Sequence, residues 1–236
     1  MTYEQFANIA SKYNINITDA MYQQFNTYYN YLREENEKYN LTTIIEEDDV
    51  FLKHFLDSII ACKYIPNNCQ LIDIGCGAGF PSVPIKIVRN DIDMTLIDAV
   101  NKKVNFVNTL CSEKLKLSHI LAIHARCEDV AKTPKYREKY DIVVARAVAS
   151  LNILLEYAIP FLKVGGKCVL LKSKLVSEEI SQAENALKEL NARIDNVINY
   201  NISELDAERS IVIITKTKPT PSKYPRQQNK ARKMPL

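Results

Sequence analysis

The sequence predicts an α/β protein with a Rossmann-like, seven-stranded, mostly parallel sheet and a helical N-terminal extension. An apolar run at 70–74 ends in a loop that holds three of the chain's five glycines, Gly75, Gly77 and Gly79. Downstream, short apolar runs alternate with helical patterns, which is typical of a parallel sheet with helices on both faces. Glycines allow a sharp turn and a close approach by a ligand, so we expect a cofactor at the carboxyl end of the first strand.

Residues 1–65 are predicted to form the helical extension. Apolar side chains between Tyr3 and Ala10 recur at helical spacing, and Thr18 or Asp19 can cap a second helix that runs to about Lys38. We expect the aromatic stripe of this second helix to belong to the core rather than to a nucleobase platform. It comprises Met21, Phe25, Tyr28, Tyr29 and Leu32.

A third helix is expected to begin at Glu47 or Asp48 and to carry His54 and Asp57 on one face. A histidine–carboxylate pair can be catalytic. Because no nucleophile lies near this pair in the sequence, we favour a structural, hydrogen-bonded pair.

Residues 66–217 are predicted to form the α/β domain. Strands are expected at 70–74, 94–98, 119–124, 140–145 and 167–172, the last after a turn at Gly165–Gly166. Helices are expected at about 81–89, 101–115 with a cap at Asn101, 127–132, 150–162 and 177–192. The runs 195–200 and 210–215 fit a closing antiparallel pair, an arrangement typical of S-adenosylmethionine-dependent methyltransferases.

The glycine loop argues against a dinucleotide. In the dinucleotide fingerprint G-x-G-x-x-G the pyrophosphate rests on free N–H groups at a helix start. Here Phe80 occupies the position of the third glycine, and Pro81 and Pro84 have no N–H to donate. The pattern D-x-G-x-G-x-G from Asp73 to Gly79 suits S-adenosylmethionine, which carries no phosphate. The alternative is that the glycines only make a tight strand-to-helix turn.

Two carboxylates extend this cofactor prediction. Asp73, in the first strand, can face the amino-acid end of the cofactor. Asp98 ends the second strand and can accept hydrogen bonds from both ribose hydroxyls.

Composition limits the remaining possibilities. Six cysteines are scattered without a C-x-x-C pair or a histidine cluster, which fits neither a zinc site nor a disulfide framework but fits a reducing cytoplasm. The N-terminus lacks the pattern of a signal peptide, and no apolar run reaches the ~18 residues that a membrane helix needs. We therefore expect a cytoplasmic protein without metal or membrane contact. We also expect a monomer, although composition does not determine the oligomeric state.

Residues 218–236 are predicted to form a basic C-terminal arm. From Lys216 onward there are seven basic residues and no acidic one, and subtracting them from the net charge of +3 leaves −4 for the rest. A basic end of this kind favours a polyanionic partner, although a solvated tail is the alternative. Four prolines and no apolar periodicity predict an extended conformation.

The segment from Asp73 to Pro81, with Pro84 and Lys86, resembles the bacterial methyltransferases that modify guanine N7 in the decoding-region loop of 16S ribosomal RNA, the small-subunit methyltransferase G or glucose-inhibited division protein B type. The sequence departs from that family at Ser82 and Ser173, where glycine is usual, and in the tail, which lacks a Gly-x-Pro segment. Other family motifs follow in order over nearly the whole chain: Asn40–Thr42, His54–Ser58, Asp98, Asn101 with Lys102, Arg126–Glu128, Ala145–Val148 and Lys223–Arg226.

The resemblance implies a set of site residues. Glu128 and the backbone of Cys127 would hold the adenine end of S-adenosylmethionine, and Phe80 and Arg146 would border the cofactor. Arg146 ends the fourth strand and would position guanine through O6 or a phosphate, without a general base, because N7 must stay free to attack. RNA contacts are expected from Lys172, after the fifth strand, and Arg209, before the last strand, and from Lys223, Arg226, Lys230, Arg232 and Lys233.

The implied partner is 16S ribosomal RNA or the small ribosomal subunit. Three other functions stay open at this point. The chain could methylate a small molecule or a protein, or it could be a non-catalytic RNA-binding module that has kept the fold. A dehydrogenase is disfavoured by Phe80 and Pro81.

Overall fold

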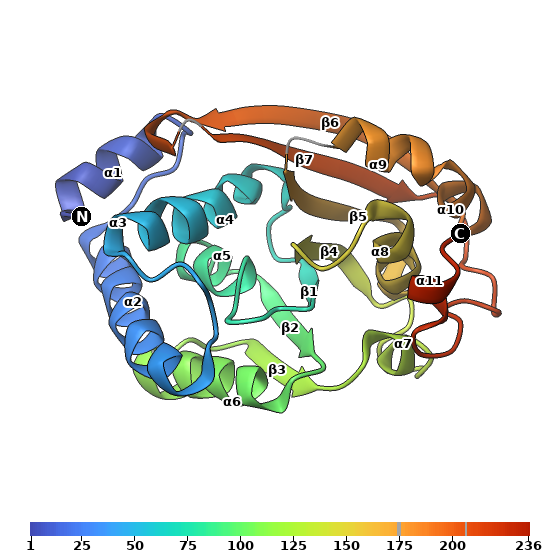
Figure 1. The fold of residues 1–236 in the computed structure, drawn as a ribbon, viewed down its shortest axis with the longest axis horizontal. Coiled ribbons are helices and arrows are strands. Elements are labelled where there is room, and N and C mark those ends of the chain that lie inside the picture. Colours follow the sequence, from blue (N-terminus) through green and yellow to red (C-terminus); the bar gives the residue numbers. More distant parts are fainter. Residues whose placement is uncertain (174–175, 206) are drawn as a thin grey trace.

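A seven-stranded sheet with the order β3-β2-β1-β4-β5-β7-β6 forms the middle layer of the molecule (Figure 1). The computed structural model describes residues 1–173, 176–205 and 207–236. β7 is antiparallel to both β5 and β6, and the other neighbouring strands are parallel. This topology confirms the fold class predicted from the sequence. The strands are β1 (Gln70–Ile74), β2 (Asp93–Asp98), β3 (Ile120–His124), β4 (Tyr140–Arg146), β5 (Leu162–Ser173), β6 (Ala192–Ile202) and β7 (Ala207–Lys216).

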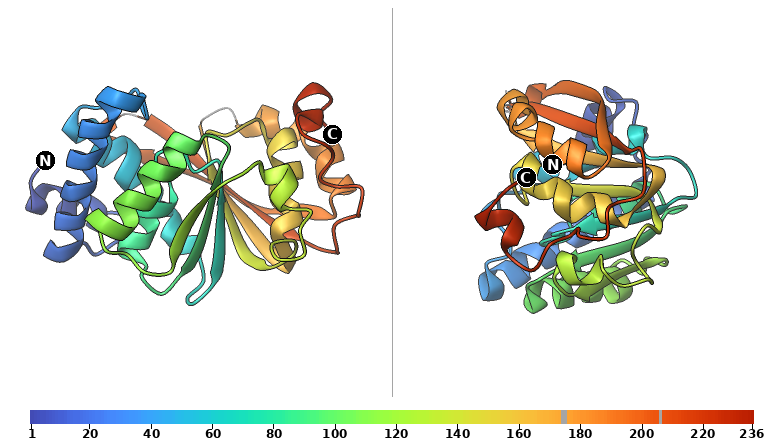
Figure 2. Two further views of the ribbon diagram at one scale, coloured as in Figure 1. Left: turned by 90° about the horizontal axis from the view of Figure 1, so that it is seen from below. Right: turned by 90° about the vertical axis from the view of Figure 1, so that its right-hand side faces the viewer.

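Helices cover both faces of this sheet, with the first half of the chain mainly on one side and the second half on the other (Figure 2). Of the described helices, none combines the length and apolar character needed to cross a bilayer. One face carries α2 (Asp19–Tyr39), α4 (Asp57–Ile59), α5 (Ser82–Val88) and α6 (Asn101–Thr109), and the other α7 (Cys127–Val130), α8 (Leu151–Ala158), α9 (Val176–Gln182), α10 (Glu184–Glu189) and α11 (Lys230–Lys233).

The central strands are apolar on both sides because each face packs against helices. In β1, Leu71 belongs to one hydrophobic cluster and Ile72 to the other, and both are fully buried. Loops follow the carboxyl ends of β1, β2 and β4, and residues of these loops line the functional site.

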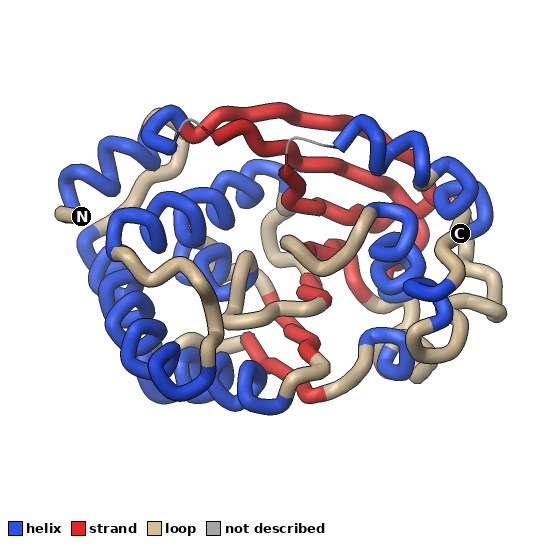
Figure 3. Tube along the Cα trace, in the orientation of Figure 1, coloured by secondary structure: helices blue, strands red, loops and turns tan. Residues whose placement is uncertain are grey.

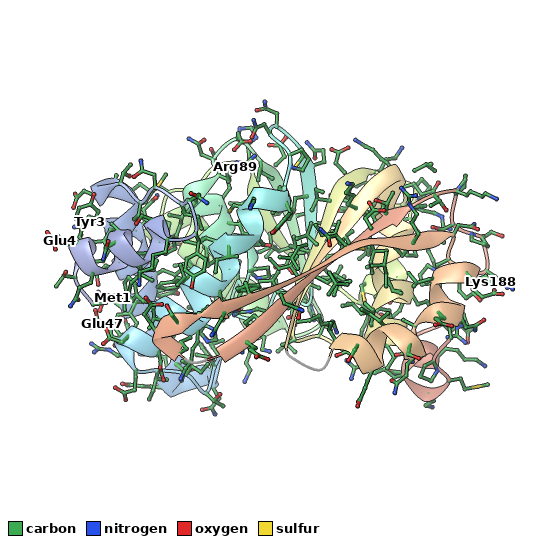
Figure 4. All side chains as sticks on the ribbon, turned by 90° about the horizontal axis from the view of Figure 1, so that it is seen from above. Met1, Tyr3, Glu4, Glu47, Arg89 and Lys188 are labelled. Carbon is green, nitrogen blue, oxygen red and sulfur yellow. The ribbon has the colours of Figure 1, made fainter. Side chains whose placement is uncertain are left out.

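The N-terminal helices share a core with the sheet. α1 (Tyr3–Ser11) and α2 are capped by Thr2 and Thr18, whose side chains accept hydrogen bonds from Gln5 N and Met21 N. The predicted core role of the α2 stripe is confirmed for Phe25, Tyr28, Tyr29 and Leu32, which are buried. The amino group of Met1 donates to Glu47 Oε1 at 2.8 Å, and the two residues lie at the same end of the molecule (Figure 4).

The third helical segment is not a regular α-helix. α3 (Glu47–Asp49) and α4 are joined by a wider, π-helical stretch, Val50–Leu56. Such stretches occur frequently at functional sites. Here the stretch carries Lys53 and His54, which both contact the functional site described below.

Several element boundaries differ from the sequence prediction. Lys172 and Arg209 lie inside β5 and β7 and pair with Ser210 and Ser173 respectively, instead of lying after and before these strands. Gly165, with φ of +86°, lies in an irregular part of β5 and not in a turn before it. α6 begins after Val100, so the predicted side-chain cap at Asn101 is wrong. The helix expected at 177–192 is two helices, α9 and α10.

The prediction of an extended C-terminal arm is also wrong. After β7 the chain turns back, packs beside α8 and ends with the short helix α11 (Figure 3). Arg226 donates through Nε and Nη2 to both carboxylate oxygens of Glu156, at 2.6–3.0 Å. Lys216 is fully buried and pairs with Glu138 at 2.6 Å. Acidic residues 70 and 78 positions away bind these cations.

Candidate functional site

Two adjoining cavities lie at the carboxyl ends of the strands. The glycine-loop cavity has a volume of about 260 Å³, and its wall includes Gly75, Asp98 and Glu128. The arginine cavity has a volume of about 560 Å³, and its wall includes His54, Arg146 and Arg209. Ala147 and Val148, directly after β4, line both cavities. A single loop thus separates the two cavities, and the larger one falls within the usual size range of ligand pockets.

Gly75 is required by the geometry of the first cavity. Its φ is +74°, and a Cβ placed there would come within 2.8 Å of Val148 Cγ2. Its N–H donates to Ile97 O at 2.8 Å, which fixes the loop against the end of β2. A side chain at this position would therefore be strained and would displace the loop that separates the cavities.

Asp98 organises the floor of the same cavity. Its Oδ2 accepts from Gly77 N at 2.9 Å and its Oδ1 from Val100 N at 2.8 Å. The carboxylate is largely buried but lines the cavity. Each oxygen has a second lone pair that a ligand hydroxyl can use.

Glu128 and Cys127 form the far end of this cavity, at the start of α7. Glu128 is buried, and its Oε1 accepts from Asn229 N at 3.3 Å. Burial and the neighbouring Glu128 carboxylate raise the pKa of the Cys127 thiol far above its usual value, so Cys127 is no nucleophile. Lys103, Tyr157 and Arg232 also line this cavity. The sequence analysis did not single out Lys103 or Tyr157, and it predicted Arg232 as an RNA contact.

The other predicted cofactor residues, in and around the glycine loop, line neither cavity. Gly77 has φ of +58° and open space at its Cβ position, and Gly79 faces Val83 and Tyr28. Phe80 is buried, with its ring stacked on Tyr28 at a centroid distance of 5.3 Å.

Asp73 is fully buried among these residues. Its Oδ2 accepts from Ser82 Oγ at 2.7 Å, and its Oδ1 has no hydrogen-bond partner among the described residues. Burial raises the pKa of Asp73 to about 8, and the Ser82 hydrogen bond and the Arg146 cation only partly oppose this shift.

Arg146 is held on several sides at the mouth of the arginine cavity. Its Nη1 donates to Lys53 O at 3.0 Å and to Asp57 Oδ2 at 3.1 Å, and its Nη2 donates to His54 Nδ1 at 2.9 Å. The guanidinium also lies over the Phe80 ring, 5.0 Å from its centroid. These contacts fix the orientation of a side chain that is 14% exposed.

The contacts of His54 define its tautomer. An arginine has no acceptor, so His54 Nδ1 must accept from Arg146, and the proton therefore lies on Nε2, 3.0 Å from Thr42 Oγ1. Burial, assisted by the Arg146 cation, lowers the pKa of His54 to about 3. The imidazole is neutral at physiological pH and is a weak base.

Asp57 binds residues from three strands, contacts that the sequence analysis did not predict. Besides Arg146 it binds Tyr200 Oη, at 2.8 Å, and Arg209 Nε, at 3.7 Å. His54 and Asp57 were predicted to pair with each other; instead, both bind Arg146. Helical spacing placed them on one face, but nothing in the sequence indicated that a strand end 89 residues away would lie between them.

Lys172 supports the loop between the cavities. Its Nζ donates to Ala149 O at 2.8 Å and to Glu179 Oε2 at 2.6 Å. The same Glu179 oxygen accepts from Leu151 N at 2.8 Å. Lys172 lines the arginine cavity, as does Arg209.

The remaining basic residues of the predicted RNA set are dispersed. Lys223 pairs with Glu189 and Arg226 with Glu156, away from both cavities. Lys230 and Lys233 are exposed and bind no carboxylate among the described residues. Within residues 1–173, 176–205 and 207–236, no three histidine, cysteine or acidic side chains gather as metal ligands would.

Comparison of the sequence with known proteins identifies the family to which the chain belongs. The family model described as GidB, rRNA small subunit methyltransferase G, matches residues 21–212. The protein named ribosomal RNA small subunit methyltransferase G from Streptococcus agalactiae serotype V is 45% identical, with all of both chains covered. Proteins of the same name from Alkaliphilus oremlandii and Lactobacillus delbrueckii subsp. bulgaricus are 45% and 42% identical, with 94% and 100% of both chains covered.

Solved structures share the fold at low sequence identity. M. jannaschii TYW2, in complex with AdoMet, is 13% identical, with a TM-score of 0.57 over 73% of this chain and 77% of that one. A putative methyltransferase from Thermoplasma acidophilum is 12% identical, with a TM-score of 0.53 over 66% of this chain and 71% of that one. This likeness supports the Rossmann-like methyltransferase fold.

The raised pKa of Asp73 predicts a pH dependence of stability. The unfolded state releases this proton near pH 3.8 and the folded state near pH 8, so between these values the folded state binds more protons, and Asp73 reduces stability as the pH rises. Asp73→Asn removes this titration. Urea unfolding at pH 5 and pH 8 should show a smaller loss of stability for Asp73→Asn than for the wild type. Equal losses in both proteins would contradict the shifted pKa.

Proposed function

The chain belongs to the GidB family of rRNA small subunit methyltransferase G, and from this premise we propose that it transfers a methyl group from S-adenosylmethionine to N7 of a guanine in the decoding-region loop of 16S ribosomal RNA. The observation that carries the proposal is the pair of adjoining cavities. One is built on the glycine loop, and the other contains a fixed arginine whose described acidic and imidazole neighbours are engaged by other residues.

The glycine-loop cavity has donors and acceptors that fit S-adenosylmethionine. Asp98 offers free lone pairs for the ribose hydroxyls, and Glu128 with the backbone of Cys127 would hold the adenine end. Gly75 leaves room that a side chain would take, and the unpartnered Asp73 Oδ1 lies beneath the loop. Gly77 and Gly79 shape the loop through their positive φ angles, and the buried Phe80 ring packs behind it. When bound, the cofactor supplies an electrophilic methyl group attached to a sulfonium.

Arg146 orients the substrate base. Its two terminal nitrogens already bind His54, Asp57 and Lys53, so the guanidinium has a single orientation at the cavity wall. A charged donor held in this way can bind guanine O6 or a backbone phosphate and leave N7 free. Catalysis then rests on orientation, since a correctly placed pair of reactants removes much of the barrier.

The chemistry requires no proton removal before attack, because N7 carries a lone pair in neutral guanine. The described residues of the arginine cavity agree with this. His54 is a weak base with a pKa near 3, and Asp57 is engaged by Arg146, Tyr200 and Arg209. Glu179, the other carboxylate that lines the cavity, accepts hydrogen bonds from Lys172 and from the backbone N–H of Leu151. Both carboxylates are thus occupied by contacts within the protein.

RNA would contact the protein around these cavities. Lys172 and Arg209 line the arginine cavity, and Lys230 and Lys233 are exposed on α11, the helix whose Arg232 lines the glycine-loop cavity. Lys223 and Arg226 were predicted as RNA contacts, but their carboxylate partners give them a structural role in holding the C-terminal segment. We further propose that the protein acts in the cytoplasm as a monomer, which light scattering can check against the mass of one chain.

Mapping of modified nucleosides tests the function directly. 16S ribosomal RNA from cells with and without the protein is digested and analysed by mass spectrometry. One 7-methylguanosine in the decoding-region loop should disappear in cells that lack the protein and return with the wild-type gene. Unchanged 16S ribosomal RNA would refute the proposed substrate and favour a protein or small-molecule substrate.

Substitution of Arg146 tests its positioning role. Arg146→Lys keeps the charge but cannot bind His54, Asp57 and Lys53 together, so single-turnover methylation at saturating cofactor should fall by about 100-fold. Arg193→Ala, a change at a 69% exposed arginine on β6, is the control and should leave the rate unchanged.

The pH profile gives a second readout of the same mechanism. The wild-type single-turnover rate should stay nearly flat from about pH 5.5 to 7, because the His54 pKa lies near 3, the Asp73 pKa lies at about 8 and an arginine stays protonated throughout. A rate that rises tenfold per pH unit, with Arg146→Lys close to wild type, would reveal a titrating base and disprove the positioning role.

Salt dependence tests the RNA contacts of the C-terminal segment. Replacing Lys230 and Lys233 with alanine should reduce the slope of log K against log salt by about 1.4, because each lost contact to single-stranded phosphate contributes about 0.7. The control is the double change Lys163→Ala and Lys167→Ala, in β5 beside the amino end of β4 and therefore away from the carboxyl ends that form the site. It removes the same charge and should leave the slope unaltered. Equal slopes for the two double variants would contradict the prediction that Lys230 and Lys233 contact RNA phosphates specifically.

A further inference from the structure

The C-terminal segment 227–236 is fixed beside the glycine-loop cavity. Arg226, directly before it, binds the buried Glu156 carboxylate with its side chain and its backbone N–H, and also donates to Met234 O at 2.9 Å. Ala231 is 3% exposed and packs into the hydrophobic cluster that includes α8. The segment therefore has a defined position on the body of the protein.

From this position the segment reaches both acidic residues at the start of α7. Asn229 N donates to Glu128 Oε1 at 3.3 Å, and Gln228 Nε2 donates to Asp129 Oδ2. Glu128 is 4% exposed and forms one end of the glycine-loop cavity. These contacts attach the segment to the part of the cavity that would hold adenine.

Arg232 is the residue of this segment that lines the cavity. It lines the glycine-loop cavity together with Tyr157 and Glu128. Burial raises the pKa of the Tyr157 hydroxyl, and a side-chain hydrogen bond with Arg232 acts in the opposite direction. Lys230 and Lys233, on the same short helix, do not line the cavity. The helix thus presents one of its three cations to the cofactor space.

We propose that Arg232 is a cofactor-binding residue that closes the adenine end of the glycine-loop cavity, rather than an RNA contact. The inference deepens the proposed function and rests on it for the identity of the cofactor. A guanidinium is planar and stacks on aromatic rings, which a lysine ammonium cannot do. A purine held at its edge by Glu128 would present its face to such a group.

The charges at the cavity are compatible with this assignment. The wall contains the carboxylates of Asp98 and Glu128, which are largely buried, and the cations of Lys103, Arg126 and Arg232. Because the segment that carries Arg232 binds Glu128, the carboxylate and the guanidinium lie at the same end of the cavity, where an uncharged adenine ring would contact both.

Calorimetry without RNA tests the proposal, with S-adenosylhomocysteine as the ligand. Arg232→Ala should weaken binding about tenfold. Arg232→Lys should bind almost as weakly as Arg232→Ala, because a positive charge alone does not replace the planar guanidinium. Lys233→Ala removes the same charge from the same helix and should bind within twofold of wild type. Since Arg232 is exposed at the surface, its substitution should not unfold the protein, which circular dichroism can verify.

A shorter ligand tests which end of the cofactor Arg232 contacts. 5′-Methylthioadenosine contains the adenosine but lacks the amino acid, so Arg232→Ala should weaken its binding by the same factor. A loss confined to S-adenosylhomocysteine would place Arg232 at the amino-acid end and overturn the proposal.

The outcomes separate this inference from the proposed function. If Arg232→Ala binds both ligands within twofold of wild type, Arg232 is not a cofactor residue, and the proposed methyl transfer is unaffected. If the wild type binds neither ligand, the proposed cofactor is wrong, and this inference falls with it.

Discussion

The contact on which the site depends is the ion pair between Asp57 and Arg146. Asp57 lies at the start of α4, on the N-terminal side of the sheet, and Arg146 ends β4, at the centre of the sheet. The same carboxylate binds Tyr200 from β6 and Arg209 from β7. One buried carboxylate therefore holds three parts of the chain around one cavity, and removing either partner of such a pair costs about 3–5 kcal/mol.

The parts of this arrangement that depend on local sequence could be predicted. The run from Gln70 to Ile74, the glycines after it and Asp98 at the next strand end follow directly from residue type and spacing. The Thr18 cap and the buried face of α2 follow in the same way. Each of these features is determined within a few residues, so that propensity and periodicity are sufficient evidence.

The parts that depend on distant partners could not be predicted. The C-terminal segment has no apolar periodicity and four prolines, which indicated an extended arm. Its position is set instead by Glu156, Glu138 and Glu189, acidic residues that precede it by 34 to 78 positions. The π-helical stretch was missed for a related reason. Nothing in Val50–Leu56 departs from an ordinary helical pattern, and its function, to offer Lys53 O and His54 to Arg146, is visible only in three dimensions.

The distribution of charge connects the fold to the function. Of the seven basic residues after position 215, Lys216, Lys223 and Arg226 are neutralised by carboxylates and hold the segment in place. Because these three pairs fix the backbone, the side chains of α11 have defined positions: Ala231 packs into the core, Arg232 faces the glycine-loop cavity, and Lys230 and Lys233 face solvent. A free basic tail would attract RNA from any direction. A tail that folds back instead holds Arg232 at the glycine-loop cavity and Lys230 and Lys233 on the same short helix, so its remaining charge has a defined place beside the proposed cofactor site.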